Sequence, residues 1–174
     1  MPAAAGRPVA RDRDAVQGVR DKAMIEVRQA DSRDTDLVAA LLAAPLSEHG
    51  LAADLKQVRR GLEVALETGA PLLVATEGSR GVGTCLANRI ASVEHGVVVL
   101  FIEELYVVPG ARRRGVARAL LGRLLAEADS SGVRAIELEV DEGHKPARSL
   151  YRSLGFEANT RTPWVLDLRR SERD

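Results

Sequence analysis

From residue 25 onward, the hydrophobic positions of the chain follow two alternating periods. In the stretch 25–30, IEVRQA, apolar and polar residues alternate as they do in a half-buried strand. Two helical patterns follow, separated by a break at 45–50, and Asp31 or Ser32 can cap the first of them. Their apolar stripes comprise Leu37, Val38, Leu41 and Leu42 in the first helix, and Leu55, Val58, Leu62 and Leu66 in the second.

The next three apolar runs predict a β-meander. They cover residues 71–77, 83–92 and 97–108, and each has the length and composition of a strand. The turn-like stretches between them, SRG and VEHG, are short enough for antiparallel hairpins. We therefore expect three neighbouring antiparallel strands in the middle of the chain.

The second half of the chain predicts a crossover connection. We expect a long helix over 115–130, a strand over 134–140, a helix around 146–154 and a last strand pair around 156–158 and 163–168. Because a strand–helix–strand unit joins parallel strands, the third meander strand and the strand that follows the long helix should be parallel neighbours. The pattern indicates an α/β (α+β) fold, with one mixed sheet of six to seven strands and about four flanking helices.

The first 23 residues differ from the rest. They mix Ala, Arg, Asp, Gly and Pro, with neither a clear apolar period nor the apolar centre of a signal peptide. A transit peptide is the alternative, but Asp12, Asp14 and Asp21 argue against it. We predict a disordered N-terminal extension over 1–23, followed by a single domain over 24–170.

Composition limits the partners that the chain can attract. The 174 residues are 45% hydrophobic, which suits one domain with a sizeable core, and 25 basic residues balance 25 acidic ones. This balance argues against nucleic-acid or membrane binding, and no apolar run approaches the roughly 20 residues of a membrane span. The single cysteine, Cys85, cannot form an internal disulfide. We expect a cytoplasmic protein, for which a homodimer stays open.

Few other residues suggest a metal or a nucleophile. His49 and His95 lie far apart in the sequence, and no metal-ligand spacing is present, so we predict no metal site. Cys85 is expected to pack beside the core, because no sequence feature specifies a histidine partner for it.

Positive charge is concentrated between the third meander strand and the long helix. The stretch 107–121, VVPGARRRGVARALL, places Arg112, Arg113 and Arg114 just before Gly115. A helix N-terminus already carries partial positive charge and unpaired backbone N–H groups, so added arginines favour a bound anion such as phosphate. A solvated turn with ordinary surface arginines is the alternative reading of these four residues alone.

The residues around this turn resemble a known motif. LYVVPGARRRGVARALLGRLL is similar to the cofactor-binding motif of the GNAT superfamily of acetyl-CoA-dependent N-acetyltransferases, (R/Q)-x-x-G-x-(G/A), which lies between a strand ending in V-x-P and a helix. The matching positions are Val107, Pro109, Arg112, Gly115 and Ala117.

A second stretch carries the same resemblance. HKPARSLYRSLGFE, residues 144–157, looks like the other signature of the family, a helix that ends in L-Y-x-x-x-G-F. The matching positions are Leu150, Tyr151, Gly155 and Phe156. The order of strands and helices from 24 to 168 also fits this family.

The resemblance implies a binding site for acetyl-CoA. It implies that the loop 112–118 holds the pyrophosphate, and that the pantetheine arm lies along the strand end 105–107 where two central strands separate. This chain departs from the family pattern in having Arg113 where glycine is frequent, Ala117 in place of glycine, and His144 in place of asparagine. The residues assigned to the cofactor are Leu105, Tyr106, Val107, Arg112, Arg113, Arg114, Gly115, Val116, Ala117, Arg118 and His144.

Acetyl transfer to an amine requires a proton acceptor, because an alkylammonium with a pKa near ~10 cannot attack a thioester. Glu103 and Glu104 are neighbours and would point to opposite faces of a regular strand. The resemblance favours Glu103 as the base. Glu104 is the second catalytic candidate, although a solvated or ion-paired role is open for it.

The departing thiolate needs a proton donor. Tyr151 matches the tyrosine that lies near the coenzyme sulfur in many family members, so the resemblance implies that it is the general acid. An aromatic ring that only packs its helix onto the sheet is the alternative. His144 is either a pantetheine ligand or an exposed loop residue.

Two functional classes follow. The first is an N-acetyltransferase that moves the acetyl group of acetyl-CoA to a primary amine of a small molecule or peptide by direct attack. The second is a noncatalytic acyl-CoA-binding or sensing module with the same fold. Tyr151 and the acidic pair favour the enzyme.

Overall fold

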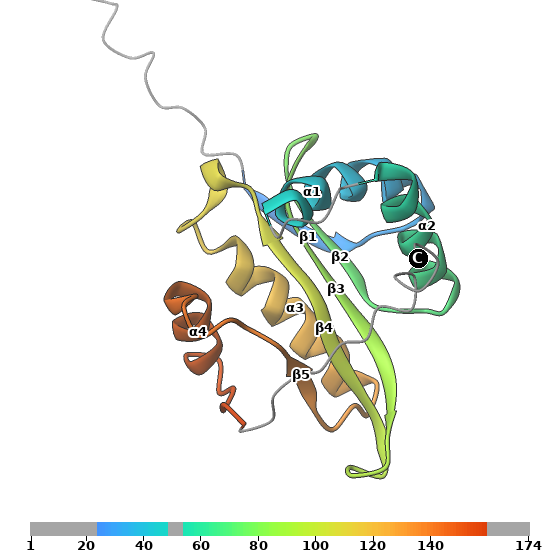
Figure 1. Ribbon diagram of the computed structural model, residues 1–174, viewed down its shortest axis with the longest axis vertical. Coiled ribbons are helices and arrows are strands. Elements are labelled where there is room, and N and C mark those ends of the chain that lie inside the picture. The colour runs from blue at the N-terminus through green and yellow to red at the C-terminus, as the bar shows by residue number, and fades with distance from the viewer. Residues whose placement is uncertain (1–23, 49–53, 160–174) are drawn as a thin grey trace, which may run out of the picture.

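A five-stranded mixed sheet forms the centre of the computed structural model, which describes residues 24–48 and 54–159 (Figure 1). The strands follow one another in chain order across the sheet. Neighbouring strands are antiparallel except for the last pair, which is parallel. They are β1 (Ile25–Gln29), β2 (Leu72–Glu77), β3 (Arg80–Ser92), β4 (Val97–Val107) and β5 (Ile136–Leu138).

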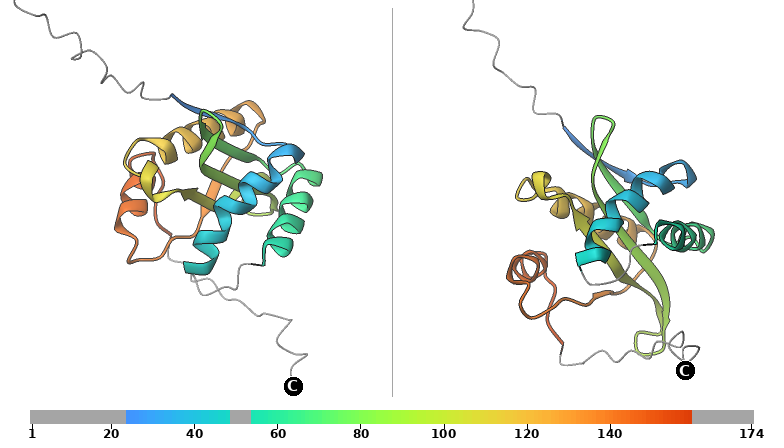
Figure 2. Two further views of the ribbon diagram at one scale, coloured as in Figure 1. Left: turned by 90° about the horizontal axis from the view of Figure 1, so that it is seen from above. Right: turned by 45° about the horizontal axis from the view of Figure 1, so that its top comes forward.

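Two helices cover each face of the sheet (Figure 2). The helices are α1 (Thr35–Glu48), α2 (Leu55–Glu67), α3 (Val116–Ser130) and α4 (Lys145–Arg152), with short 3-10 turns at Ser32–Asp34 and Pro109–Ala111. Helices α1 and α2 lie on one face, and α3 and α4 lie on the other. The molecule is therefore a three-layer α/β domain within the described ranges.

The core has two halves because the central strands are buried on both faces. In β2, Leu72 and Val74 pack toward α1 and α2, whereas Leu73 and Ala75 pack toward α3. Helix α3 contributes Leu120, Leu121, Leu124 and Ala128, all buried. Burial of a leucine side chain stabilises a fold by about 1.5–3 kcal/mol, so this apolar stripe holds α3, and the loop before it, firmly on the sheet.

The expected meander and the crossover connection are confirmed. Strands β2, β3 and β4 form consecutive antiparallel pairs, and β4 and β5 are parallel neighbours joined through α3. Helix α3 begins one residue after the expected start. The capping role of Asp31 is also confirmed, since its side chain accepts a hydrogen bond from the Arg33 backbone N–H at 2.9 Å, at the turn that leads into α1.

The expected six to seven strands are not matched. The segment 134–140 contributes only the three residues of β5, because it pairs with Leu100–Ile102 and then leaves β4. Residues 156–158 form no strand, and the expected strand 163–168 lies outside the described residues. The expected break at Pro45 is wrong as well: α1 continues to Glu48, since one proline removes a single internal hydrogen bond close to the helix end.

Candidate active site

Strands β4 and β5 separate after residue 102. Their pairing ends at Ile102, yet β4 continues to Val107. Within the described residues, the edge of β4 over 103–107 therefore has no partner strand on its β5 side; we call this segment the open edge. The Val108 N–H bonds to the Val82 carbonyl on the β3 side, so by alternation the backbone of Val107 and Leu105 faces the open edge.

A β-bulge lies at the start of the open edge. Leu86 pairs with Glu104 and Ala87 pairs with Ile102, so Glu103 is an additional residue in β4. The bulge shifts the alternation of side chains: Ile102 and Leu105, three residues apart, both pack into the core on the α3 side.

The bulge places both glutamates on one face. Tyr106 packs with α1 and α2, and Glu104, two residues before it, shares that face. Glu103 bonds to Asn88, which alternation along β3 assigns to the same face. The expectation that Glu103 and Glu104 point to opposite faces is therefore wrong, because it holds only for a regular strand.

Glu103 has a hydrogen-bond partner that sequence reasoning missed. Asn88 on β3 donates from Nδ2 to Glu103 Oε2 at 2.5 Å. Asn88 and Glu104 are half-buried, and Glu103 is exposed. No signal along the chain predicts this pair, because it depends on the register between β3 and β4.

The loop before α3 contains two left-handed residues. Arg113 has φ 62° and Gly115 has φ 84°, after which α3 begins at Val116. A non-glycine residue pays a conformational cost of about 1–2 kcal/mol in this region. The loop therefore keeps at Arg113 a backbone conformation that suits glycine. Ala111 and Val116, both buried, fix its two ends.

Three of the arginines in the stretch 112–118 bind protein groups: Arg112, Arg118 and Arg114. Arg112 donates from Nε to the Val107 carbonyl at 3.0 Å, and its guanidinium lies 5.9 Å from the centre of the Tyr106 ring. Arg118 donates from Nη2 to Ser153 Oγ on α4 at 2.6 Å. These bonds tie the loop and the start of α3 to β4 and α4.

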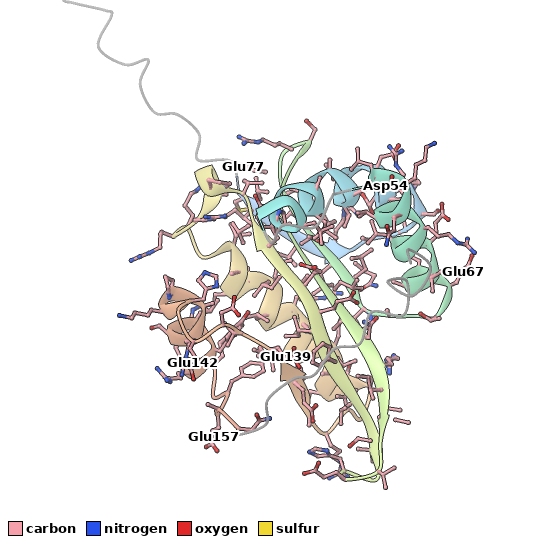
Figure 3. All side chains as sticks on the ribbon, in the orientation of Figure 1. Asp54, Glu67, Glu77, Glu139, Glu142 and Glu157 are labelled. Atoms are coloured by element: carbon pink, nitrogen blue, oxygen red, sulfur yellow. The ribbon has the colours of Figure 1, made fainter. Side chains whose placement is uncertain are left out.

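The third of these arginines, Arg114, forms an ion pair with Glu77 at the end of β2. Figure 3 shows Glu77 beside the loop that precedes α3. Both side chains are largely shielded, with 29% and 20% exposure, and the hydrogen bond from Arg114 lowers the pKa of Glu77. By contrast, the exposed Arg113 makes no hydrogen bond or ion pair with another described residue.

Tyr151 lies in α4, and His144 is the N-cap residue of that helix. The Tyr151 ring is half-buried, lies 5.7 Å from the Phe156 ring, and packs against the core that contains Cys85. Burial, with a smaller contribution from Cys85, raises the pKa of Tyr151, so its hydroxyl is protonated at neutral pH. His144 is exposed at the N-cap of α4, and its backbone N–H bonds to the Asp141 carbonyl at 3.0 Å.

The sequence pattern of the acetyltransferase (GNAT) family matches residues 36–156, which is more than half of the chain. The chain belongs to this family. The uncharacterized N-acetyltransferase YhfO of Bacillus subtilis (strain 168) is 29% identical over 138 residues, 78% of this chain and 92% of that protein. The ribosomal protein bS18-alanine N-acetyltransferase of Escherichia coli (strain K12) is 43% identical over 78 residues, 45% of this chain and 51% of that enzyme.

Solved structures share the GNAT fold. A predicted acetyltransferase from Clostridium acetobutylicum, solved with acetyl-CoA, has a TM-score of 0.70 and 22% identity, and the match covers 84% of this chain and 98% of that one. The chain is thus a GNAT acetyltransferase, and the enzymes of this family use acetyl-CoA.

The residues of this GNAT chain fit acetyl-CoA. The left-handed Gly115 precedes the first turn of α3, where unpaired N–H groups and the positive helix end suit a pyrophosphate. The open edge offers the backbone groups of Leu105 and the N–H of Val107, whose carbonyl already accepts from Arg112, and these suit the amides of a pantetheine arm. No group of three or more His, Cys, Asp or Glu side chains among the described residues could hold a metal ion. None of the described helices is both long and apolar enough to cross a membrane.

The buried Cys85 gives a first prediction. Burial raises the pKa of its thiol to about 12, so the thiol stays protonated and inert at neutral pH. We expect iodoacetamide at neutral pH to leave the folded protein unmodified and to alkylate Cys85 only in denaturant, as measured by intact mass. Rapid alkylation of the native protein would show that β3 opens readily around this residue.

Proposed function

We propose that this GNAT enzyme transfers the acetyl group of acetyl-CoA to a primary amine of a small molecule or peptide by direct attack. The observation that carries the proposal is the bulge at Glu103, which brings a carboxylate to the start of the open edge. A site for the donor and a proton acceptor for the amine are thereby only a few residues apart on one strand.

In the proposed complex, the loop 112–118 binds the pyrophosphate mainly through backbone N–H groups. The side chains of Arg112, Arg114 and Arg118 are committed to protein partners, which supports a role in holding the loop, while Arg113 is the arginine left for direct contact with phosphate. Residues 105–107 and His144 contact the pantetheine arm.

When bound, acetyl-CoA supplies a thioester whose carbonyl carbon the free amine attacks, with release of a thiolate. Glu103 accepts a proton from the incoming ammonium, directly or through a water, and Glu104 on the same face adds negative charge that favours a cationic acceptor. Tyr151 donates its hydroxyl proton to the thiolate, and the second proton that the amine nitrogen loses as the amide forms restores the Tyr151 hydroxyl, directly or through a water. Because burial raises the pKa of Tyr151, its efficiency depends on position more than on acidity. The proton gained by Glu103 leaves to solvent.

The acceptor class is tested with a panel of amines. The similarity to an enzyme named for a ribosomal protein alanine supports including peptides with an N-terminal alanine beside alkylamines and diamines. We expect thiol release from acetyl-CoA that depends on at least one amine, together with an acetylated product by mass spectrometry. Calorimetric binding of acetyl-CoA without thiol release with any amine would favour the noncatalytic acyl-CoA-binding alternative.

A further inference from the structure

The hydrogen bond between Asn88 and Glu103 connects two strands at the proposed reaction centre. Asn88 pairs with Phe101 in the β3–β4 ladder, so its backbone is already part of the sheet. Its side-chain amide is free of that ladder and donates to Glu103 Oε2 at 2.5 Å. The sheet therefore does not require this side chain, and asparagine is a residue that strands otherwise disfavour.

The hydrogen bond from Asn88 restricts the conformations of the Glu103 side chain. This side chain is exposed and rises from the β-bulge. An exposed glutamate samples many rotamers, and fixing one of them costs entropy that a charge-assisted hydrogen bond can offset. One Glu103 oxygen is thus held by Asn88, and within the described ranges the other oxygen makes no hydrogen bond that would keep it from an incoming amine.

We propose that Asn88 is a positioning residue for acetyl transfer: it holds the Glu103 carboxylate so that its second oxygen faces the acceptor amine. This inference rests on the proposed function, in which Glu103 accepts the proton of the amine. It assigns to β3 a part in the reaction that neither family motif contains, since both motifs lie C-terminal to β3. A base held about 1 Å out of place loses much of its effect. The loss of Asn88 should therefore lower kcat and leave the stability of the fold nearly unchanged.

A double-mutant cycle tests the proposal. The variants Asn88→Ala, Glu103→Gln and their combination are compared by kcat, by KM for the amine, and by the calorimetric Kd for acetyl-CoA. We expect Asn88→Ala to lower kcat by about ten-fold with unchanged acetyl-CoA affinity. In the Glu103→Gln background the same substitution should change kcat by less than about two-fold, because there is no base left to position.

Two further variants sharpen this test. Asn88→Asp places a second carboxylate against Glu103 and cannot donate, so it should lower kcat at least as much as Asn88→Ala. Asn88→Val suits a strand and also lacks a donor, which keeps the test available where alanine disturbs folding. Arg89→Ala, at the next, exposed position of β3, is the matched control and should retain wild-type kcat.

The possible failures are distinguishable. Wild-type turnover in Glu103→Gln would show that Glu103 is not the base. It would overturn both the proposed proton transfer and the positioning role of Asn88. A clear loss in Glu103→Gln together with wild-type turnover in Asn88→Ala and Asn88→Val would overturn the positioning role alone. The positioning role would also be overturned if Asn88→Ala lowered kcat by the same factor in the wild-type protein and in Glu103→Gln, since the two residues would then act independently.

Discussion

Replacing Tyr151 by phenylalanine is expected to lower kcat by about a hundred-fold or more, which is the range that a positioned acid contributes. The ring is half-buried against Phe156 and the core, and phenylalanine preserves this packing while deleting the hydroxyl. The protonated state of Tyr151 at neutral pH follows from its raised pKa. The Kd for acetyl-CoA and the melting temperature should change little. Steady-state kinetics, calorimetry and thermal unfolding measure the three quantities.

Phe156 supplies the control for this experiment. Phe156→Leu disturbs the same ring contact but leaves the Tyr151 hydroxyl in place, so it should lower the melting temperature more than it lowers kcat. Near wild-type kcat in Tyr151→Phe would show that the tyrosine does not act as the acid. A collapse in stability of Tyr151→Phe would show that the hydroxyl satisfies a buried partner and that its role is structural.

Reversing the charge of Arg114 is expected to weaken acetyl-CoA binding by at least about ten-fold, or about 1.4 kcal/mol. Arg114→Glu sets a second carboxylate against the largely shielded Glu77, and the repulsion should move the loop that precedes α3. Titration calorimetry gives the Kd. Arg123→Glu, which breaks an exposed ion pair with Glu127 further along α3, is the matched control and should bind normally.

A charge swap distinguishes two roles for Arg114. If the arginine acts by holding the loop to β2, the double variant Glu77→Arg with Arg114→Glu restores the ion pair and should recover most of the lost affinity. If it contacts phosphate itself, the swap leaves a carboxylate at that contact and the affinity stays low. A wild-type Kd for acetyl-CoA in Arg114→Glu alone would show that this part of the loop does not contribute to the binding site.

Most of the fold was predictable because its signals lie along the chain. The meander followed from apolar runs with short turns, and the parallel pairing of β4 and β5 followed from the long helix between them. The strand count was not predictable, since the composition of 134–140 does not reveal where its pairing with β4 ends. Likewise the length of α1 depends on a proline that its packing tolerates.

The residues of the candidate site were also only partly predictable from the sequence. The two motifs pointed to Tyr151 and to the loop, whose assigned roles stay predictions. The partners of these residues were hidden: Glu77 lies 37 residues before Arg114, and Asn88 lies 15 residues before Glu103. The bulge that turns both glutamates to one face is a property of two strands in register, so no pattern in β4 alone reveals it.

The open edge also bears on how the protein behaves in solution. Unpaired strand edges can recruit strands from other molecules, and proteins commonly blunt them with charges and bulges. Here the segment is short and begins with a bulge at Glu103 followed by Glu104, so it carries two such safeguards. A donor arm lying along the same backbone would complete its hydrogen bonds. If acetyl-CoA binds along this edge as proposed, we expect saturation with the cosubstrate to lower any aggregation of the ligand-free enzyme, as measured by light scattering.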